Sequence, residues 1–465
     1  MDILLTHGYF LYEDPREREV MKPYPPLGIL YISSYLKQRG FAVNVFDTTF
    51  SSYDDLRAYV ERERPPVVGI YCNLMTRPRA VRSIKLFKEL GSTVIAGGPD
   101  SANYPAEYLE HGADIVVIGE GELTLEELLP HIARYGTTGM RHIHGIVYRE
   151  DDEIVYTAPR AYIPDLSEMP FPDREAINIA EYVRVWREHH GMGSVSLITA
   201  RGCPYRCKWC SHAVFGYTHR RRTVENVADE LELILETYEP DMVWYADDVF
   251  TIHRSWFFNY AEELKRRGIN IPFETISRQD RLKDDIIETL SEMGCFRIWV
   301  GAESGSQRIL DSMDRRTDAE DVRRVVRSLQ RNGIEAGMFI MLGYHGEEIS
   351  DLEATVDHLK ASDPDLFLTT VAYPIKGTPY YEEVEDRVIP MKSWSEGSDR
   401  DFTVAGRHSR RFYDFANRWM VNEVKFHQQR QNGHGTLPRM AKAFVNAKLG
   451  RAGMMLTQRE VEHGQ

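Results

Sequence analysis

The chain has 465 residues, of which 42% are hydrophobic and 28% charged, and its formal net charge is −14. A length above ~250–300 residues predicts at least two domains, because single cores rarely grow larger. The acidic balance argues against general nucleic-acid binding, which needs a large basic surface. No run of ~18 apolar residues occurs, so the sequence predicts no membrane-spanning helix. Since the first residues, MDILLT, enter a strand without the basic segment of a signal peptide, we expect a cytoplasmic protein.

Residues 1–140 alternate short apolar runs with helical patterns. Strands are expected at 2–6, 42–46, 67–71, 93–97 and 114–118, and helices near 27–39, 52–62, 77–90, 104–110 and 122–133. Continuous β-branched runs between amphipathic helices predict an α/β domain with a doubly wound parallel sheet that is buried on both faces. Such a sheet binds ligands beyond the carboxyl ends of its strands.

Glycine and polar residues gather in the loops that follow these strands. The candidate binding residues are Thr6, Asn73, Leu74, Gly97, Gly98, Pro99, Gly119, Glu120, Gly121 and Glu122. Glycines there allow a flat ligand or a phosphate to approach the backbone, although a structural tight turn explains each of them equally well. The motifs GxGxxG and GxxxxGK[ST] are absent, which disfavours a dinucleotide or a P-loop nucleotide.

Residues 141–192 are expected to connect two domains. The run 143–157 predicts a hairpin with an acidic turn at 150–153, and the proline-rich stretch 163–173 is typical of a linker.

A second series of strands and helices occupies residues 193–382. Strands are expected at about 195–199, 242–246, 272–276, 296–301, 335–342 and 366–372, and helices near 223–238, 254–267, 282–293, 319–332 and 348–361. Six βα units are too few for a complete eight-stranded barrel and predict an open (β/α)6 partial barrel. Residues 383–465 are expected to form a helical C-terminal region.

Three of the five cysteines, Cys203, Cys207 and Cys210, lie in the run RGCPYRCKWC, just after the first strand of this series. Thiolates that converge on one loop favour an iron–sulfur cluster, zinc or copper(I). Closed zinc sites and fully ligated 4Fe-4S clusters normally use four protein ligands, and no second CxxC occurs. Three ligands therefore leave one metal position for another molecule. His212 keeps a zinc site of three cysteines and one histidine open as an alternative.

The other two cysteines, Cys72 and Cys295, lie in apolar strand-like runs and are expected to be small buried hydrophobic residues.

The CxxxCxxC spacing resembles the signature of radical S-adenosylmethionine (SAM) enzymes, in which three cysteines hold a 4Fe-4S cluster whose fourth iron binds SAM. Polar residues at the ends of the later strands follow the order of that family's core across residues 193–382. By this resemblance, Asp247 is expected at the amino group of the methionine part and Arg278 at its carboxylate. Glu303 and Ser304 are expected near the ribose.

The same resemblance places an aromatic residue before the third cysteine, close to adenine. Trp209 takes that position, where the family usually has Phe, and the strand that contains Met341 is expected to offer its backbone to the adenine.

The N-terminal loops, in particular AGGPD at 96–100 and GEGE at 119–122, resemble the cobalamin-binding domain that precedes many radical SAM cores. One departure is the absence of the DxHxxG motif, which supplies a histidine to the lower face of cobalt. His111 stands in another context and is expected to cap a helix. The lower cobalt ligand therefore stays open, and so does the alternative that the domain has kept its shape and lost cobalamin.

The resemblance implies a 5′-deoxyadenosyl radical that attacks an unactivated C–H bond and, with cobalamin, methyl transfer to carbon. The arrangement is also similar to anaerobic Mg-protoporphyrin monomethyl ester cyclases, so a radical cyclisation or ring rearrangement is the alternative within the class. A non-catalytic cluster-binding sensor or scaffold and a zinc-binding regulatory module are alternatives of other classes. The expected partners are a small-molecule or lipid-like substrate and an external one-electron donor of the flavodoxin or ferredoxin type, without nucleic acid.

The C-terminal residues 407–420 mix bases with aromatic residues at roughly helical spacing. This pattern predicts a helix that packs on the barrel with its basic face in water. The alternative is a lid, or peripheral contact with an anionic membrane surface.

Overall fold

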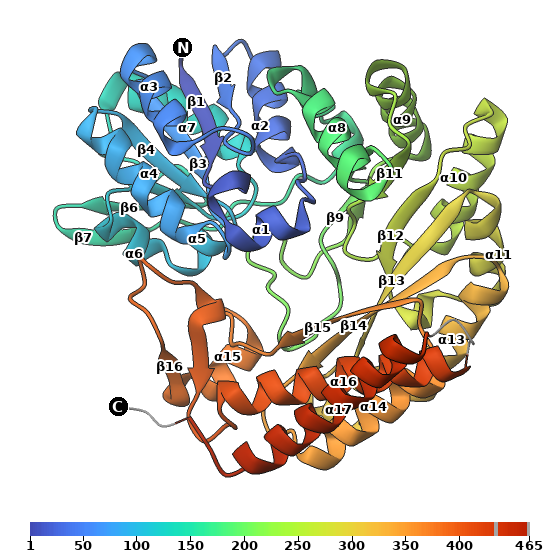
Figure 1. The fold of residues 1–465 in the computed structure, drawn as a ribbon. Coiled ribbons are helices and arrows are strands. Elements are labelled where there is room, and N and C mark those ends of the chain that lie inside the picture. The colour runs from blue at the N-terminus through green and yellow to red at the C-terminus, as the bar shows by residue number, and fades with distance from the viewer. Residues whose placement is uncertain (432–435, 463–465) are drawn as a thin grey trace. The chain divides into compact units, whose positions relative to one another are not determined.

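The computed structural model describes residues 1–431 and 436–462 (Figure 1). The chain divides into two compact units. The first contains Met1–Tyr205, Ser211–Asp247 and Lys392–Ser398, and the second contains Arg206–Cys210, Asp248–Met391 and Asp399–Gln465. Over the described ranges, no helix combines the length and apolar character needed to cross a membrane.

A seven-stranded sheet in the order β2-β1-β3-β4-β5-β6-β7 forms the centre of the first unit. Its parallel strands are β1 (Ile3–His7), β2 (Val43–Phe46), β3 (Val67–Tyr71), β4 (Thr93–Gly97) and β5 (Ile115–Val117). The predicted hairpin, β6 (Ile146–Glu150) and β7 (Glu153–Tyr156), continues the sheet in antiparallel fashion. The accompanying helices are α1 (Pro15–Val20), α2 (Leu27–Gln38), α3 (Tyr53–Glu63), α4 (Arg77–Glu89), α5 (Pro99–Asn103), α6 (Pro105–Glu110) and α7 (Glu122–Tyr135).

Side chains that alternate along these strands belong to two separate buried clusters. In β1, Ile3 and Leu5 enter one cluster together with Ile29 of α2, whereas Leu4 enters the other together with Ile84 of α4. Each fully buried side chain of this size stabilises the fold by roughly 1.5–3 kcal/mol. A sheet covered on both faces explains why its strands are apolar without interruption, and the predicted doubly wound fold is confirmed.

The first unit also contains a second group of elements. They are α8 (Ile179–His190), β8 (Ser194–Leu197), β9 (Ala200–Arg201), β10 (Arg220–Arg221), α9 (Val224–Tyr238) and β11 (Met242–Tyr245). Strands β8 and β11 pair in parallel, and β9 pairs with β10 in antiparallel fashion. Helix α8 was not among the predicted helices.

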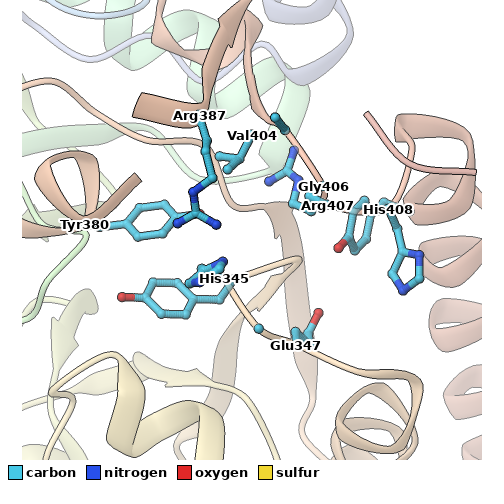
Figure 2. Close-up of a pocket in the computed structure, with 12 residues that line it drawn as sticks. His345, Glu347, Tyr380, Arg387, Val404, Gly406, Arg407 and His408 are labelled. Carbon is cyan, nitrogen blue, oxygen red and sulfur yellow. The ribbon is translucent and has the colours of Figure 1, made fainter. Parts of the chain in front are cut away.

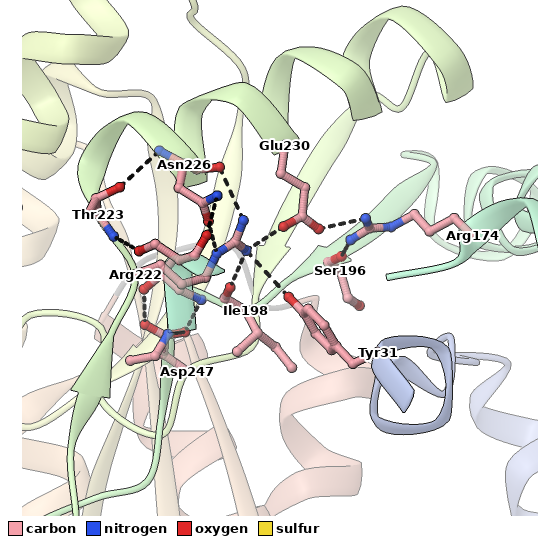
Figure 3. A network of polar contacts seen from close by, with 12 residues as sticks. Tyr31, Arg174, Ser196, Ile198, Arg222, Thr223, Asn226, Glu230 and Asp247 are labelled. Carbon is pink, nitrogen blue, oxygen red and sulfur yellow. Dashed lines mark hydrogen bonds and ion pairs between the residues drawn. The ribbon is translucent and has the colours of Figure 1, made fainter. Parts of the chain in front are cut away.

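A buried ion network holds this second group against α2 (Figure 3). Glu230 of α9 pairs with Arg174 at 2.6 Å and with Arg222, whose Nη1 also donates to the Tyr31 hydroxyl at 3.3 Å. Arg174 Nη2 donates to the carbonyl of Ser196 in β8 at 3.0 Å. Breaking such a network by removing one partner is costly, because a buried charge loses its counterion.

The second unit contains a four-stranded parallel sheet in the order β15-β14-β13-β12. Its strands are β12 (Phe273–Ser277), β13 (Cys295–Glu303), β14 (Glu335–Leu342) and β15 (Leu366–Val371). Helices α10 (Arg254–Arg267), α11 (Asp284–Glu292), α12 (Gln307–Ser312), α13 (Ala319–Arg331), α14 (Ile349–Ser362) and α15 (Pro379–Val384) accompany them. With β8 and β11 of the first unit, all six strands predicted for residues 193–382 are present.

The remaining elements are short except for the last two helices. Strands β16 (Val388–Pro390) and β17 (Phe402–Val404) form an antiparallel pair, and the 3-10 helices are η1 (Leu11–Glu13), η2 (Leu166–Glu168), η3 (Arg174–Ala176), η4 (Gln279–Arg281), η5 (Glu385–Arg387) and η6 (Asp399–Asp401). Helices α16 (Arg410–Gln431) and α17 (Leu437–Thr457) pack side by side (Figure 1). The predicted helical C-terminal region is confirmed.

Candidate active site

All five cysteines lie in the described part of the chain, and none forms a disulfide. Cys207 is buried, Cys203 is partly buried and Cys210 is exposed. Over residues 1–431 and 436–462, no three His, Cys, Asp or Glu side chains converge as they would around a metal ion. Their role as cluster ligands therefore stays a prediction from their spacing in the sequence. Cys72 and Cys295 are buried, as predicted.

Two buried arginines of the second unit are directed at the Cys207 sulfur. Arg278 follows β12, and its Nη1 lies 3.7 Å from Cys207 Sγ, while Nη1 of Arg315 lies 3.8 Å from the same atom. Nη2 of Arg278 also donates to the backbone carbonyl of Arg315 at 3.0 Å, which fixes the Arg278 guanidinium relative to the segment that carries Arg315. Arg315 was not among the predicted site residues.

These contacts test whether the loop fits a metal cluster. Burial raises the pKa of the Cys207 thiol above its ordinary value, and the positive charge of Arg278 opposes that rise. A cluster ligand is a thiolate, and hydrogen bonds and positive charge around the sulfur stabilise that anion. The donor set, three thiols with two guanidinium groups at one of them, therefore fits a 4Fe-4S cluster.

Glu303 lies at the end of β13 in a left-handed backbone conformation, with φ of 61°. The pairing of β13 with β14 shifts register between Gly301 and Glu303, so the carboxyl group is placed by a local irregularity of the sheet. Burial raises the pKa of Glu303 to about 8, against the opposing charge of Arg278. Its Oε1 lies 3.8 Å from Arg315 Nε. A neutral carboxyl group that keeps both a donor and an acceptor is therefore available here at pH 7.

Trp209 and Met341, both expected near adenine, belong to one apolar cluster of the second unit. Met341 of β14 is buried there beside Tyr344 and Tyr380, and Trp209 packs against the same cluster. The guanidinium of Arg315 lies over the Trp209 ring at 5.9 Å. Sequence positions far apart therefore share one apolar wall next to the Cys207 sulfur.

Two other predicted SAM residues are engaged within the protein. Ser304 Oγ lies 3.1 Å from Thr355 Oγ1 and accepts the Ser306 N–H at 3.1 Å. Asp247, in the first unit, accepts the N–H of Thr199 at 2.7 Å and also binds the Thr199 hydroxyl. Arg221 donates to Asp247 at 3.2 Å. These bonds explain why both side chains are buried, and their roles toward SAM stay predictions.

The predicted cobalamin residues lie at or just after the carboxyl ends of four neighbouring parallel strands, β1, β3, β4 and β5, so the structure brings them to one edge of the sheet. A Cβ at Gly97 would meet nothing within 4 Å, which leaves open space over the backbone at the end of β4. Gly98 has φ of 106°, and a Cβ there would lie 2.5 Å from the Cys72 carbonyl oxygen. This edge fits a flat group that approaches the backbone, as cobalamin would.

Several side chains at this edge have internal partners instead. Thr6 donates to the carbonyl of Phe46 at 2.8 Å, and Asn73 Oδ1 accepts the N–H of Met75 at 2.9 Å. Leu74, Pro99, Gly119 and Gly121 are partly exposed. His111 bonds through Nδ1 to the carbonyl of Glu107 at 2.8 Å, at the end of α6, in agreement with its predicted capping role.

Glu120 and Glu122 form a buried ion cluster with the arginines that flank the cysteine loop. Arg201 donates to Glu120 and Glu122 at 2.7 Å each, and Arg220 donates to Glu120 at 2.8 Å. Glu120 also accepts the N–H of Ile163 at 2.9 Å. Arg201 stands directly before Gly202 and Cys203, and nothing in this local sequence predicts its contact with Glu120 and Glu122.

Comparisons with known proteins identify two domains in the chain. The family model of the B12 binding domain matches residues 18–129, and that of the radical SAM superfamily matches residues 197–359. An uncharacterized methyltransferase of Pyrococcus horikoshii is 26% identical over 392 residues, which are 83% of this chain and 84% of that protein. An anaerobic magnesium-protoporphyrin IX monomethyl ester cyclase of Rubrivivax gelatinosus is 26% identical over 80% of this chain and 68% of its own length.

Among solved structures, the fold is similar to the cobalamin-dependent SAM radical enzyme OxsB with aqua-cobalamin bound. The TM-score is 0.75, with 16% identity over 98% of this chain and 80% of that one. A radical SAM domain binds a 4Fe-4S cluster and SAM, and a B12-binding domain binds cobalamin. The chain belongs to the radical SAM enzymes that carry an N-terminal B12-binding domain.

Proposed function

We propose that this enzyme methylates an unactivated carbon of a small-molecule or lipid-like substrate. When bound, the cluster and SAM supply a 5′-deoxyadenosyl radical, and cobalamin supplies the methyl group. The observation that carries the proposal is the presence of a B12-binding domain and a radical SAM domain in one chain. The similarity to the P. horikoshii methyltransferase over most of both chains supports it.

In this proposal the residues assigned to the cluster and to SAM have separate tasks. Cys203, Cys207 and Cys210 hold the cluster, and Arg278 and Arg315 stabilise negative charge on the Cys207 sulfur. The apolar wall around Met341 excludes water from the adenine of SAM. Glu303 offers a neutral carboxyl group to the ribose, and Ser304 holds the loop that carries it.

The edge of the sheet in the first unit takes cobalamin in this proposal. Gly97 and Gly98 let the macrocycle approach the end of β4, and Asn73 and Leu74 lie at the end of the neighbouring strand β3. Asp247 keeps its predicted assignment to the amino group of SAM, although its carboxylate already binds Thr199 and Arg221.

The proposal is tested by loading the full chain with iron, sulfide and cobalamin under anaerobic conditions and measuring iron and cobalt on one sample. We expect four irons and one cobalt per chain. With a reductant and substrate candidates, each methylated carbon should yield one S-adenosylhomocysteine and one 5′-deoxyadenosine. Four irons without cobalt, and 5′-deoxyadenosine without S-adenosylhomocysteine, would overturn methyl transfer and leave a radical cyclase, which the R. gelatinosus relative supports.

Single substitutions separate the enzyme from a non-catalytic sensor or scaffold. Cys203→Ala, Cys207→Ala and Cys210→Ala should each abolish 5′-deoxyadenosine formation and leave the cobalamin absorption spectrum unchanged. SAM binding without any 5′-deoxyadenosine in the wild type, at full cluster content, would support the scaffold instead.

The same proposal includes an external one-electron donor of the flavodoxin or ferredoxin type and a cytoplasmic location. Purified donors of both types, reduced chemically, should each be compared with dithionite for the rate of 5′-deoxyadenosine formation. If neither donor raises the rate of 5′-deoxyadenosine formation above the rate measured without a donor, both types of donor are excluded.

We also propose that α17 contacts an anionic membrane surface. The helix contains four basic residues and no acidic one, although the chain has a net charge of −14. Its apolar side chains Phe444, Leu449 and Leu456 are exposed, Leu456 to 84%. Vesicles with phosphatidylglycerol should sediment the wild type, whereas phosphatidylcholine vesicles and the double variant Lys442→Glu, Lys448→Glu should show no co-sedimentation. Equal binding of wild type and variant would contradict the proposal.

A further inference from the structure

A cavity of about 200 Å³ lies in the second unit, beyond the end of β14 (Figure 2). Residues of the loop after β14, of α15 and η5, and of the stretch that runs from the end of β17 into α16 line it. Figure 2 shows Arg387, Tyr380 and His345 on one side of the cavity, and Arg407, Glu347 and His408 on the other. The cavity is therefore built by three stretches of chain that are distant in sequence.

The lining contains an unusual number of polar atoms without a hydrogen-bond partner in the described structure. These buried atoms are Tyr344 Oη, Glu347 Oε1, Tyr380 Oη, Arg407 Nε and His408 Nδ1. An unpaired buried polar group costs about 1–3 kcal/mol, so five around one cavity indicate that something else binds them.

Arg407 and Glu347 line the cavity, and each keeps one polar atom that its partners within the protein do not occupy. Arg407 gives its Nη atoms to the carbonyl of Gly343, the carbonyl of Ala372 and the hydroxyl of Thr403. Its Nε–H remains, and an arginine Nε is always a donor. Glu347 accepts the N–H of Gly343 through Oε2 at 2.5 Å, so Oε1 is the oxygen that remains.

The charge of the lining is positive. Arg387 and Arg407 carry two positive charges, and Glu347 is the acidic residue of the lining. Burial raises the pKa of Glu347 to about 8, so its carboxyl group is largely neutral at pH 7 and becomes a further donor. Two cations, a carboxylic acid and two unpaired phenol hydroxyl groups together favour an oxyanion as ligand.

The cavity adjoins the candidate active site within the second unit. The N–H of Tyr380 donates to the carbonyl of Lys208, in the cysteine loop, at 2.9 Å. The rings of Tyr344 and Tyr380 stack at 4.6 Å and belong to the apolar cluster that contains Met341 and Trp209. A molecule with one end in the cavity therefore extends toward the residues assigned to SAM.

We propose that this cavity binds an oxyanion group, a carboxylate or a phosphate, of the substrate, and so sets which carbon faces the SAM-derived radical. The inference rests on the proposed function where it identifies the bound molecule as the substrate. Binding of the oxyanion itself does not depend on turnover. It assigns the substrate to the class of small acids that carry a charged group several bonds away from the reacting carbon.

The test measures anion binding to the cluster-loaded full chain without reductant, by calorimetry at constant ionic strength in chloride. The probes are butyrate, succinate and inorganic phosphate, and SAM is titrated in parallel. Loss of a hydrogen bond to a charged group weakens binding by about tenfold or more, so we expect that change for Arg387→Gln and for Tyr380→Phe. Tyr380→Phe keeps the stacked ring and removes the unpaired hydroxyl, so it leaves the fold intact. Arg324→Gln, an exposed arginine on α13, is the matched control and should bind as the wild type does.

The outcomes distinguish a carboxylate from a phosphate ligand, and a group of the substrate from the carboxylate of SAM. Saturable binding of the carboxylates alone, or of phosphate alone, identifies the group that the cavity takes. No saturable binding of any probe, or equal binding by wild type and both variants, overturns the proposal and leaves a water-filled cavity. If SAM affinity falls in step with probe affinity in the variants, the cavity serves the carboxylate of SAM, and the substrate assignment is overturned. None of these readouts depends on methyl transfer, so a failure of the proposed function remains distinguishable.

Discussion

The Cys207 sulfur lies between two guanidinium groups that reach it from different segments of the second unit. Arg278 follows β12, and Arg315 lies beyond α12 in a segment where Asp314 and Arg316 adopt left-handed backbone conformations. Such conformations persist only where the surrounding structure enforces them, and they are common at functional sites. The two arginines therefore belong to a constrained arrangement around one thiol.

Arg315→Gln should slow 5′-deoxyadenosine formation about tenfold or more, which corresponds to ~1.4 kcal/mol of activation free energy. The variant removes a positive charge 3.8 Å from the Cys207 sulfur, so the additional electron of a reduced cluster is less well stabilised. Quantified 5′-deoxyadenosine at equal iron content measures the effect. Arg316→Gln, next in sequence and exposed, is the matched control and should keep the wild-type rate.

Glu347→Gln should change how stability depends on pH. Burial raises the folded-state pKa of Glu347 to about 8, and Asp351 raises it further, while the Gly343 N–H, Arg407 and Arg308 oppose the rise. Between the unfolded value near 4.5 and the folded value near 8, the folded chain holds a proton that the unfolded chain has lost. The stabilisation that this proton supplies is complete below the unfolded-state pKa of 4.5, and it is lost as pH rises through the folded-state pKa of about 8.

Urea unfolding in chloride buffers from pH 5 to 9 measures this effect. The wild type should lose on the order of 3 kcal/mol more than Glu347→Gln over that range. Parallel curves for the two proteins would show that Glu347 is ionised in the folded state throughout. The other titrating groups are common to both proteins, so they cancel in the difference.

The cysteines were identifiable from sequence because their spacing is local, whereas their surroundings were not. Arg315 lies 108 residues from Cys207, and nothing in its neighbourhood, MDRRT, distinguishes it from an exposed arginine. Glu120 was predicted as a cobalamin residue because the loop GEGE at 119–122 resembles that of cobalamin-binding domains. Its buried ion pairs with Arg201 depend on a contact across 81 residues, which no local pattern contains.

At the level of elements, the alternating strands and helices were predictable because each strand is a continuous apolar run and each helix has one apolar face. The predicted bounds of strands β1 to β5 and β12 to β15 agree with the observed bounds within about two residues. Helix α1 was missed because none of its residues is buried, so it has no periodic pattern. Helix α8 does have buried Tyr182 and Trp186, but it follows a proline-rich stretch that favoured a linker.

The loop between β5 and α7 is held to the β9–β10 pair by Glu120. Glu120→Ala should lower the free energy of unfolding by about 3–5 kcal/mol, because Arg201 and Arg220 would lose a buried counterion. The urea midpoint at an unchanged slope measures the loss. Glu127→Ala, on the adjoining helix α7, removes a half-exposed partner of Arg160 and should change stability by less than about 1 kcal/mol.

Helices α16 and α17 approach closely because small residues face the contact. A Cβ at Gly450 would lie 2.5 Å from the Trp419 backbone nitrogen, and one at Gly453 would lie 2.4 Å from the Phe415 ring. Gly450→Ala should therefore destabilise the second unit by about 1–3 kcal/mol despite the better helix propensity of alanine. A lowered thermal midpoint measures this, and Leu449→Ala, at an exposed neighbouring position, should leave it nearly unchanged. A rise in the midpoint for Gly450→Ala would contradict the close packing.

On the scale of the whole molecule, the two units are interleaved along the chain. The segment Lys392–Ser398 belongs to the first unit, although the residues before and after it belong to the second. Trp394 packs there against Tyr108 at 5.0 Å and His111 at 4.8 Å, and the guanidinium of Arg77 lies over its ring at 5.2 Å. Neither unit is therefore a single continuous stretch that one cut would release.

Trp394→Ala should destabilise the first unit by about 1–3 kcal/mol, because the partly buried ring contributes apolar contact and an aromatic pair. Hydrogen exchange followed by mass spectrometry should become faster in α6, where Tyr108 lies. Trp394→Phe retains a ring and should recover most of the protection. Unchanged exchange in α6 would show that the segment does not contribute to that unit.

The interleaving also determines when the first unit can finish folding during synthesis of the chain. A ribosome makes the strands of the seven-stranded sheet first, but the segment that contains Trp394 follows more than two hundred residues after β7. At translation speeds of ~5–20 residues per second, the 286 residues from Tyr108 to Trp394 take about 14 to 57 s to make. During that time the rings of Tyr108 and His111 lack the contact with Trp394 that they have in the folded protein, and transiently exposed apolar surface of this kind favours aggregation.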